Sequence, residues 1–390
     1  MHLARRTLWF CALAVGLVAS GCGGSSPGDD DDDGPNPPSN CTGGLGEWTG
    51  HDNVMASFDP PCGLQPKQAP LFVALGWDDN PDAAGVEFAM KVVEDRGGHT
   101  TFYVTSTYAS SEATVAAWRK AKEHGHEIGN HTVLHEHGGM FTADRWRTEI
   151  GGCNDFLTMG AGAIMTPAEI YGFRTPFLEY NDATLATVAA LGFQYDCSIE
   201  EGYEDGQDGT NFYWPYTLDN RSPGHTAQVA WGEGKVEIEP HPGLWEMPTY
   251  AVFTPPDDKC EEYGIPSGFR ARLKAKVDWF DPAGGSITGF DYNLWAVASA
   301  GGFEMTKAEF LATLKYSLDL RAQGNRAPFL LGIHSAYYLD SWSTNAPGAP
   351  NAADRQAAIA EFLDYAKEKY DARIASYKEV LDWVRNPQPI

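Results

Sequence analysis

The stretch L-F-V-A-L-G-W-D-D at residues 71–79 is an apolar run that ends in two adjacent carboxylates, Asp78 and Asp79. A short apolar run of this kind is typical of a buried strand. The segment that follows, residues 83–96, has helical periodicity and ends at Gly97 and Gly98. The sequence therefore predicts one strand–helix unit here, with two acidic groups at the strand's carboxyl end.

Similar units recur along most of the chain. Repeated strand–helix units imply parallel strands joined by right-handed crossovers. We therefore expect an α/β fold, a distorted (β/α) barrel of about seven parallel strands with a loop-rich insertion at about 200–305. Further strands are predicted at 100–105, 127–130, 170–174, 193–199, 328–333 and 373–376, with a strand-like segment at 244–253; further helices are predicted at 112–124, 142–157, 182–191, 307–322, 354–370 and 378–385.

Three more polar motifs lie at the ends of predicted strands or just after them. His131 and His135 are four residues apart, Arg174 precedes Thr-Pro-Phe, and His334 closes the run L-G-I-H. In βα barrels the carboxyl edge of the strands carries the chemistry. We expect these side chains to meet at that edge.

Two imidazoles and one carboxylate can bind a divalent metal, which leaves the other carboxylate and the third imidazole for proton transfer. Each motif has a plainer interpretation. Asp78-Asp79 suits a turn, the paired histidines an exposed surface, Arg174 a surface ion pair and His334 a buried core position. Their shared placement and complementary roles favour a metal-assisted hydrolase.

Composition limits the class of protein. The chain has 390 residues, of which 43% are hydrophobic and 21% are charged, as in a soluble globular protein with a sizeable core. Its formal charge of −25 argues against a nucleic-acid partner, because phosphate binding needs clustered Lys and Arg. It also disfavours electrostatic adhesion to anionic lipid.

The N-terminus has the pattern of an export signal. Arg5 and Arg6 precede the apolar residues 8–18, and the small residues 19–21 precede Cys22. Ala-Ser-Gly-Cys resembles a bacterial lipobox, which predicts a lipoprotein signal peptide at 1–21 and lipidation of Cys22; an ordinary cleaved signal is the alternative. Residues 22–61 would be a flexible acidic linker and N-terminal segment. The sequence predicts an exported cell-envelope lipoprotein, at the outer membrane or cell surface, that meets the membrane only through its lipid.

Five cysteines remain after Cys11 and Cys22, namely Cys41, Cys62, Cys153, Cys197 and Cys260. Export permits disulfides, but an odd number leaves at least one thiol free or paired outside the chain. The pairing stays open. No C-x-x-C spacing occurs, so a thiolate zinc site is not expected.

The motifs together resemble those of the polysaccharide deacetylase family (carbohydrate esterase family four). They read G-W-D-D (76–79), H-T-V-L-H (131–135), R-T-P-F (174–177) and L-G-I-H (331–334), against the family's T-F-D-D, H-[ST]-x-x-H, R-x-P-[YF] and [IL]-x-[IL]-H. The resemblance covers residues 62–387. Further stretches are similar to chitin deacetylases of arthropods: Y-D-x-S-I at 195–199, W-P-Y-T-L-D at 214–219, P-G-x-W-E-x-P at 242–248 and N-R-A-P-F at 325–329.

The resemblance implies a role for each motif residue. Asp78 would be the catalytic base, oriented by Arg174, and His334 the general acid. The backbone N–H of Phe177 would stabilise the oxyanion. One divalent metal, Zn²⁺ in the first instance, with Co²⁺ or another divalent ion as the alternative, would be held by Asp79, His131 and His135. Asp196 would be the acid that tunes His334.

The implied reaction is metal-dependent hydrolysis of N-acetyl groups on N-acetylglucosamine-containing glycans, such as chitin or its oligosaccharides, to glucosamine units and acetate. Acetyl ester hydrolysis on O-acetylated polysaccharide, or glycan binding without turnover, are the alternatives. We expect a monomer. Aromatic side chains in loops could line a sugar groove or simply pack beneath the insertion; these are Trp214, Tyr216, Trp245, Tyr337, Tyr338 and Trp342.

Overall fold

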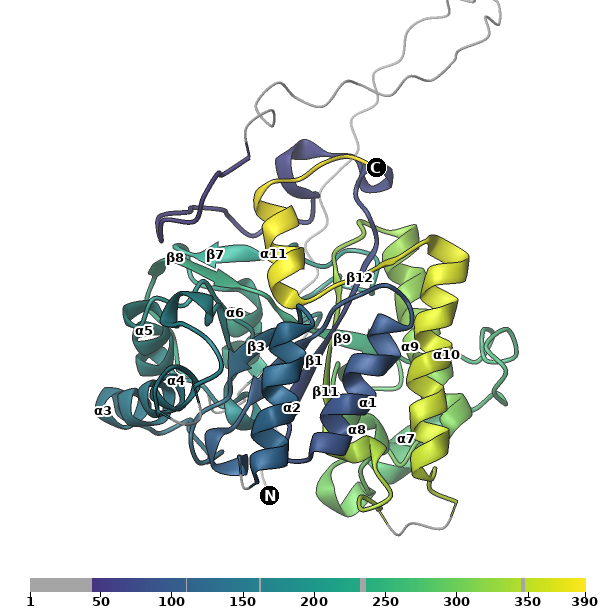
Figure 1. Cartoon of the computed structure of the whole chain (residues 1–390). Coiled ribbons are helices and arrows are strands. Elements are labelled where there is room, and N and C mark those ends of the chain that lie inside the picture. The colour runs from purple at the N-terminus through teal and green to yellow at the C-terminus, as the bar shows by residue number, and fades with distance from the viewer. Residues whose placement is uncertain (1–43, 110, 161–162, 232–235, 345–347) are drawn as a thin grey trace, which may run out of the picture. The chain divides into compact units, whose positions relative to one another are not determined.

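The computed structural model describes residues 44–109, 111–160, 163–231, 236–344 and 348–390. The predicted signal peptide, Cys22 and most of the acidic linker lie outside these ranges. Figure 1 shows a curled sheet with helices packed along its outer face.

Parallel strands form most of the main sheet, in the order β11-β1-β2-β3-β4-β5-β8-β7, with β12 paired to β1. Only the pairing of β7 with β8 is antiparallel among these described strands. Seven parallel neighbours therefore run from β11 to β8, as predicted, and the last of them, β8, comes from within the insertion. The strands are β1 (Phe72–Asp79), β2 (Thr101–Val104), β3 (Glu127–Asn130), β4 (Gly172–Phe173), β5 (Tyr195–Asp196), β7 (Tyr216–Leu218), β8 (His241–Glu246), β11 (Phe329–His334) and β12 (Arg373–Ile374).

Helices follow the strands as the periodicity predicted. Apolar side chains of α1, α2, α5, α9 and α10 share one buried cluster with the outward-facing residues of the sheet, whereas those of α11 belong to a second cluster. The predicted helix at 142–157 is a short α-helix, a π-helical turn at Arg147–Gly151 and a second α-helix in direct succession. The α-helices are α1 (Ala83–Glu94), α2 (Glu112–Glu123), α3 (Ala143–Trp146), α4 (Gly152–Thr158), α5 (Asp182–Ala190), α6 (Pro223–Trp231), α7 (Phe269–Lys276), α8 (Asp291–Trp295), α9 (Lys307–Gln323), α10 (Ala352–Tyr370) and α11 (Tyr377–Arg385).

Strand β1 shows how the sheet separates two layers of core. Side chains alternate across a strand. Val73, Leu75 and Trp77 face the helices, whereas Phe72 and Ala74 belong to the inner cluster on the concave side. The inner cluster also contains Tyr103, Tyr195 and Tyr377, so the inside of the curled sheet is filled with side chains.

The insertion is more regular than its composition suggested. It contains a second sheet of β6 (Glu200–Glu201), β9 (Thr249–Phe253) and β10 (Ser286–Thr288), in the order β10-β9-β6. The strand expected at 244–253 is in fact two strands, β8 and β9, one in each sheet. A parallel bridge joins Phe290 to Gly332, so the chain after β10 lies against β11.

Both ends of the described chain pack at the amino edge of the strands. The N–H of Tyr377, at the start of α11, donates to Thr101 Oγ1, and that of Lys378 donates to Glu127 Oε2. Asp52, in the segment expected to precede the domain, accepts hydrogen bonds from Trp245 Nε1 at 2.8 Å and Arg385 Nε at 2.6 Å. Residues 44–61 therefore pack on the domain.

Two further observations concern the helices and the cysteines. Within the described ranges, no helix has both the length and the apolar content needed to cross a bilayer. Cys153, Cys197 and Cys260 are free thiols, in keeping with the expectation that the cysteines are not all paired.

Candidate active site

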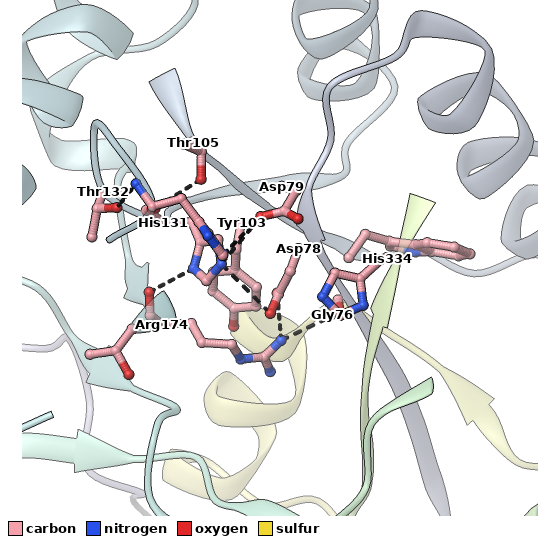
Figure 2. A network of polar contacts seen from close by, with 12 residues as sticks. Gly76, Asp78, Asp79, Tyr103, Thr105, His131, Thr132, Arg174 and His334 are labelled. Atoms are coloured by element: carbon pink, nitrogen blue, oxygen red, sulfur yellow. Dashed lines mark hydrogen bonds and ion pairs between the residues drawn. The ribbon is translucent and has the colours of Figure 1, made fainter. Parts of the chain in front are cut away.

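The four motifs converge at the carboxyl edge of the main sheet. Asp78 and Asp79 end β1, His131 follows β3 directly, Arg174 follows β4 directly, and His334 ends β11. Asp78 is in register with His334 on the neighbouring strand. Parallel strands end at the same edge, so residues separated by some 250 positions become neighbours. Figure 2 shows these side chains pointing toward one another.

Asp79, His131 and His135 form the one group of three possible metal ligands found among the described residues. Their ligand atoms all lie within 4.8 Å of one another. Asp79 Oδ1 is 3.6 Å from His131 Nε2 and 3.2 Å from His135 Nε2. The two histidines are on a loop, not on a helix, and left-handed backbone at Thr132 (φ 72°) and His135 (φ 54°) turns the second imidazole back toward the first.

These residues fit a divalent cation. Asp79 Oδ1 is buried and accepts no hydrogen bond from the part of the chain that the structure describes. His131 Nδ1 is 2.8 Å from the carbonyl oxygen of Arg174, which leaves Nε2 directed at Asp79. Burial, and then the neighbouring His135, lower the pKa of His131 to about 3, so its imidazole is neutral and able to coordinate. Two imidazoles and a carboxylate are the donor set of many catalytic zinc sites.

Asp78 lies beside this triad, held by a buried guanidinium. Arg174 Nη1 donates to Asp78 Oδ1 at 2.8 Å, and both side chains are buried. Arg174 Nη2 donates to Tyr377 Oη at 2.9 Å, and its guanidinium lies 4.4 Å from the centre of the Tyr103 ring. Burial raises the pKa of Asp78 and outweighs the opposing effect of Arg174, which makes Asp78 a stronger base than an exposed aspartate.

Gly76 provides the space for this guanidinium. A Cβ atom at Gly76 would lie 2.8 Å from Arg174 Nη1 and 3.0 Å from Tyr103 Cε2. The family pattern has threonine at this position. Because glycine has no Cβ atom, Arg174 can approach β1 closely at this position, next to the Asp78 carboxylate that Arg174 orients.

His334 has a carboxylate partner that the sequence prediction missed. Asp291, at the start of α8, contacts the imidazole Nδ1 at 2.7 Å through Oδ1 and accepts the His334 backbone N–H at 3.0 Å through Oδ2. Burial lowers the pKa of His334, but the charge and hydrogen bond of Asp291 outweigh it and raise the pKa to about 9. The only signal in the sequence was an acidic residue between two aromatic residues, Phe290 and Tyr292.

Asp196, the predicted partner of His334, lies elsewhere. It accepts hydrogen bonds from the backbone and the hydroxyl of Ser198, both at 2.9 Å. Ser198 Oγ in turn accepts the backbone N–H of Thr175 at 2.9 Å. Asp196 thus supports the turn that follows Arg174. The prediction failed because β5 ends several strands away from β11 in the sheet.

A cavity of about 330 Å³ opens over the triad. Phe177 and Tyr337 line it, together with Phe290, Tyr292 and Asn293 from the insertion. Phe177 has a left-handed backbone (φ 57°) and is 53% exposed at the rim. Tyr337 stacks on His334 with ring centres 4.5 Å apart, so the aromatic wall continues up to the candidate acid.

Trp214, Tyr216 and Trp245, predicted to bind sugar, are at most 2% exposed and line no part of this cavity. Each donates its polar hydrogen to a protein acceptor, to Asn325 O, Glu201 Oε1 and Asp52 Oδ2 respectively. They belong to the core beneath the insertion. Tyr338 is buried too, whereas Trp342 stacks on Tyr337 with ring centres 4.3 Å apart.

Comparisons with known proteins agree with this geometry. Residues 65–195 match the family model described as polysaccharide deacetylase. Chitin deacetylase 8 of Bombyx mori is 24% identical over 370 residues, covering 87% of this chain and 77% of the relative. The "putative polysaccharide deacetylase" from Mycobacterium smegmatis has a similar fold, with a TM-score of 0.53 and 18% identity, covering 85% of this chain and 95% of that one.

The family model ends at residue 195, before His334. In the fold, His334 lies at the same edge of the sheet as the motifs inside the matched region. The similarity to the Bombyx mori relative extends over most of the chain. Over residues 65–195 this chain therefore matches the polysaccharide deacetylase family, and its motifs and curled parallel sheet are similar to those of the relatives described above.

Proposed function

We propose that this protein is a metal-dependent hydrolase that removes acetyl groups from N-acetylglucosamine units of a β-linked glycan such as chitin or its oligosaccharides. The observation that carries the proposal is the meeting of a possible metal triad, a buried base and a paired imidazole around one cavity. The similarity to a chitin deacetylase supports the choice of substrate class.

Asp79, His131 and His135 would hold the cation, Zn²⁺ in the first instance. Such an ion supplies Lewis acidity for the acetyl carbonyl and lowers the pKa of water. Asp78 accepts the proton of the attacking water, and Arg174 keeps its carboxylate turned toward the cavity. The backbone N–H of Phe177, at the cavity rim, is the proposed donor to the developing oxyanion.

His334 donates a proton to the departing amine. An amide anion is a poor leaving group, so the reaction needs an acid at this point. The contact with Asp291 favours the protonated imidazole and fixes the ring, so that Nδ1 faces the carboxylate. The nitrogen Nε2 then remains for the substrate. The products are acetate and a glucosamine unit.

The test is acetate release from acetylated chitooligosaccharides by the Zn²⁺-loaded protein. Asp78→Asn removes the base and should lower kcat by about 10²–10⁴-fold. Asp82→Asn, an exposed aspartate just after the same strand, is the matched control and should act as wild type. Release from acetyl esters alone would assign the enzyme to O-acetylated polysaccharide instead, and no release from any acetylated glycan would refute the proposal.

We also propose that the protein is exported and held at the cell envelope by a lipid on Cys22. This rests on the N-terminal sequence pattern, which lies outside the described residues. Mass spectrometry of the membrane fraction should find the mature chain starting at an acylated Cys22. A soluble chain that starts at another residue would refute the anchor.

A further inference from the structure

A second cavity of about 1030 Å³ adjoins the one over the triad. Thr288 and Asn293 line both, so the two spaces share a wall at the end of β10. A space of this volume is at the upper end of the range for pockets that bind small molecules. It has room for more than one sugar unit beyond the unit at the triad.

Hydrogen bonds hold the shared wall in place. Thr288 Oγ1 donates to Glu200 Oε1 at 2.6 Å and lies 2.8 Å from Tyr203 Oη. Asn293 Nδ2 donates to the carbonyl oxygen of Thr288 at 3.1 Å. The wall therefore joins β6, β10 and α8, the same α8 that presents Asp291 to His334. A ligand in the second cavity would thus lie directly beside the reaction site.

The second cavity is acidic. Its lining includes four carboxylates and one guanidinium, that of Arg270. Arg270 already donates to the carbonyl oxygens of Thr254, Pro282 and Ala283. Its charge is therefore fixed against the wall of the cavity. The carboxylates that outnumber it are Glu200, Glu204, Asp208 and Asp281.

Such a lining distinguishes two kinds of sugar unit. An N-acetylglucosamine unit is neutral and gains nothing from the excess negative charge. A glucosamine unit carries an ammonium group and is attracted by it. Trp279 adds an aromatic surface, since 59% of it is exposed while its ring packs on Phe303 with ring centres 5.3 Å apart. An indole can stack on a sugar ring and attract a nearby ammonium group.

We propose that this second cavity is a binding site for already deacetylated glucosamine units, so that the enzyme prefers partly deacetylated chains over fully acetylated ones. The inference rests on the proposed function, because it takes the neighbouring units of the same glycan as the ligand. The second cavity would then recognise glucosamine units, the product of the enzyme, within the glycan chain. Each acetyl group removed would then improve binding for the next.

The experiment measures binding and turnover separately. Calorimetry with the Zn²⁺-loaded full chain compares a glucosamine tetrasaccharide with its fully acetylated counterpart. We expect the glucosamine tetrasaccharide to bind more tightly, with an affinity that falls as NaCl rises. Glu204→Gln should weaken it about two- to fivefold, as for one partly exposed charge pair, and Trp279→Ala should weaken it about threefold.

Glu123→Gln, an exposed glutamate on α2, is the control for loss of one charge and should leave binding unchanged. In turnover, a tetrasaccharide with one acetyl unit among glucosamines should have the higher kcat/KM, and Glu204→Gln should reduce that advantage. Equal affinity for the two tetrasaccharides, or a preference unaffected by both variants, would overturn the site. Absence of acetate release from either substrate would refute the deacetylase function while leaving the binding comparison intact.

Discussion

At the scale of single residues, the candidate acid depends on one carboxylate. Asp291 is fully buried and contacts both the ring and the backbone of His334. Burial alone would lower the pKa of an imidazole, whereas the paired carboxylate reverses the direction and raises it to about 9. Asp291 therefore stabilises the protonated form of the His334 imidazole.

Asp291→Asn tests this positioning role. The acid is present below the pKa of His334 and is lost as pH rises through it, near 9 in the wild type. Without the charge of Asp291 that pKa falls, so the alkaline limb of the kcat profile should move to lower pH. We expect kcat at neutral pH to fall about 10- to 100-fold.

Asp340→Asn, an exposed aspartate in the turn after Tyr338, is the control for the loss of one negative charge in the segment that follows β11. Its pH–rate profile should match that of the wild type. An unchanged alkaline limb in Asp291→Asn would show that Asp291 has only a structural role.

At the scale of elements, short strands are followed by loops that carry the reactive groups. The loop with both candidate histidine ligands follows β3 and is held from outside by the π-helical turn at Arg147–Gly151. Glu149 Oε2 accepts the backbone N–H groups of Val133 and Leu134 at 3.1 and 2.9 Å. Its other oxygen is paired with Arg145 at 2.8 Å. The π-helical turn thus fixes the backbone of the loop that carries His131 and His135.

Glu149→Ala should loosen that loop without unfolding the domain. We expect Zn²⁺ affinity to fall about 10- to 100-fold, the usual effect of losing a group that orients a ligand. Chelator competition measures the affinity, and circular dichroism checks the fold. Asp155→Ala, an exposed aspartate on α4, is the matched control and should bind Zn²⁺ as the wild type does. Unaltered affinity in Glu149→Ala would mean that β3 alone positions the histidines.

At the scale of the whole domain, contacts between distant segments close the amino edge of the barrel opposite the site. Asp52, Trp245 and Arg385 meet there, from the N-terminal segment, the insertion and the last helix. Tyr377 in that same helix reaches Arg174 through its hydroxyl. The last helix therefore links the stability of the fold to the orientation of the candidate base.

Arg385→Ala leaves Asp52 buried without its charged partner. Removing one member of a buried ion pair costs about 3–5 kcal/mol. The free energy of unfolding from urea titration should fall by about that amount. Arg221→Ala is the control, because Arg221 forms an exposed pair with Glu239 at 3.4 Å, and such pairs contribute about 0–1 kcal/mol. Similar losses for the two variants would show that the Asp52–Arg385 contact does not stabilise the domain.

Local patterns in the sequence were enough to predict the alternating strands and helices, the α/β class and the four motifs at strand ends. They succeeded because strand and helix periodicities, and the polar groups that end them, are properties of neighbouring residues. The edge rule predicted that an aspartate of the first motif would meet the two histidines, and the resemblance to the family implied that this aspartate is Asp79.

Only the tertiary structure decided three features. They are the partner of His334, the burial of Trp214, Tyr216 and Trp245, and the splitting of residues 244–253 between two sheets. These features depend on how a long insertion folds back across β11 and β5. The sequence around an aromatic or acidic residue is the same whether its side chain faces solvent or the core. Contacts between residues far apart in the chain determine whether that side chain is exposed or buried.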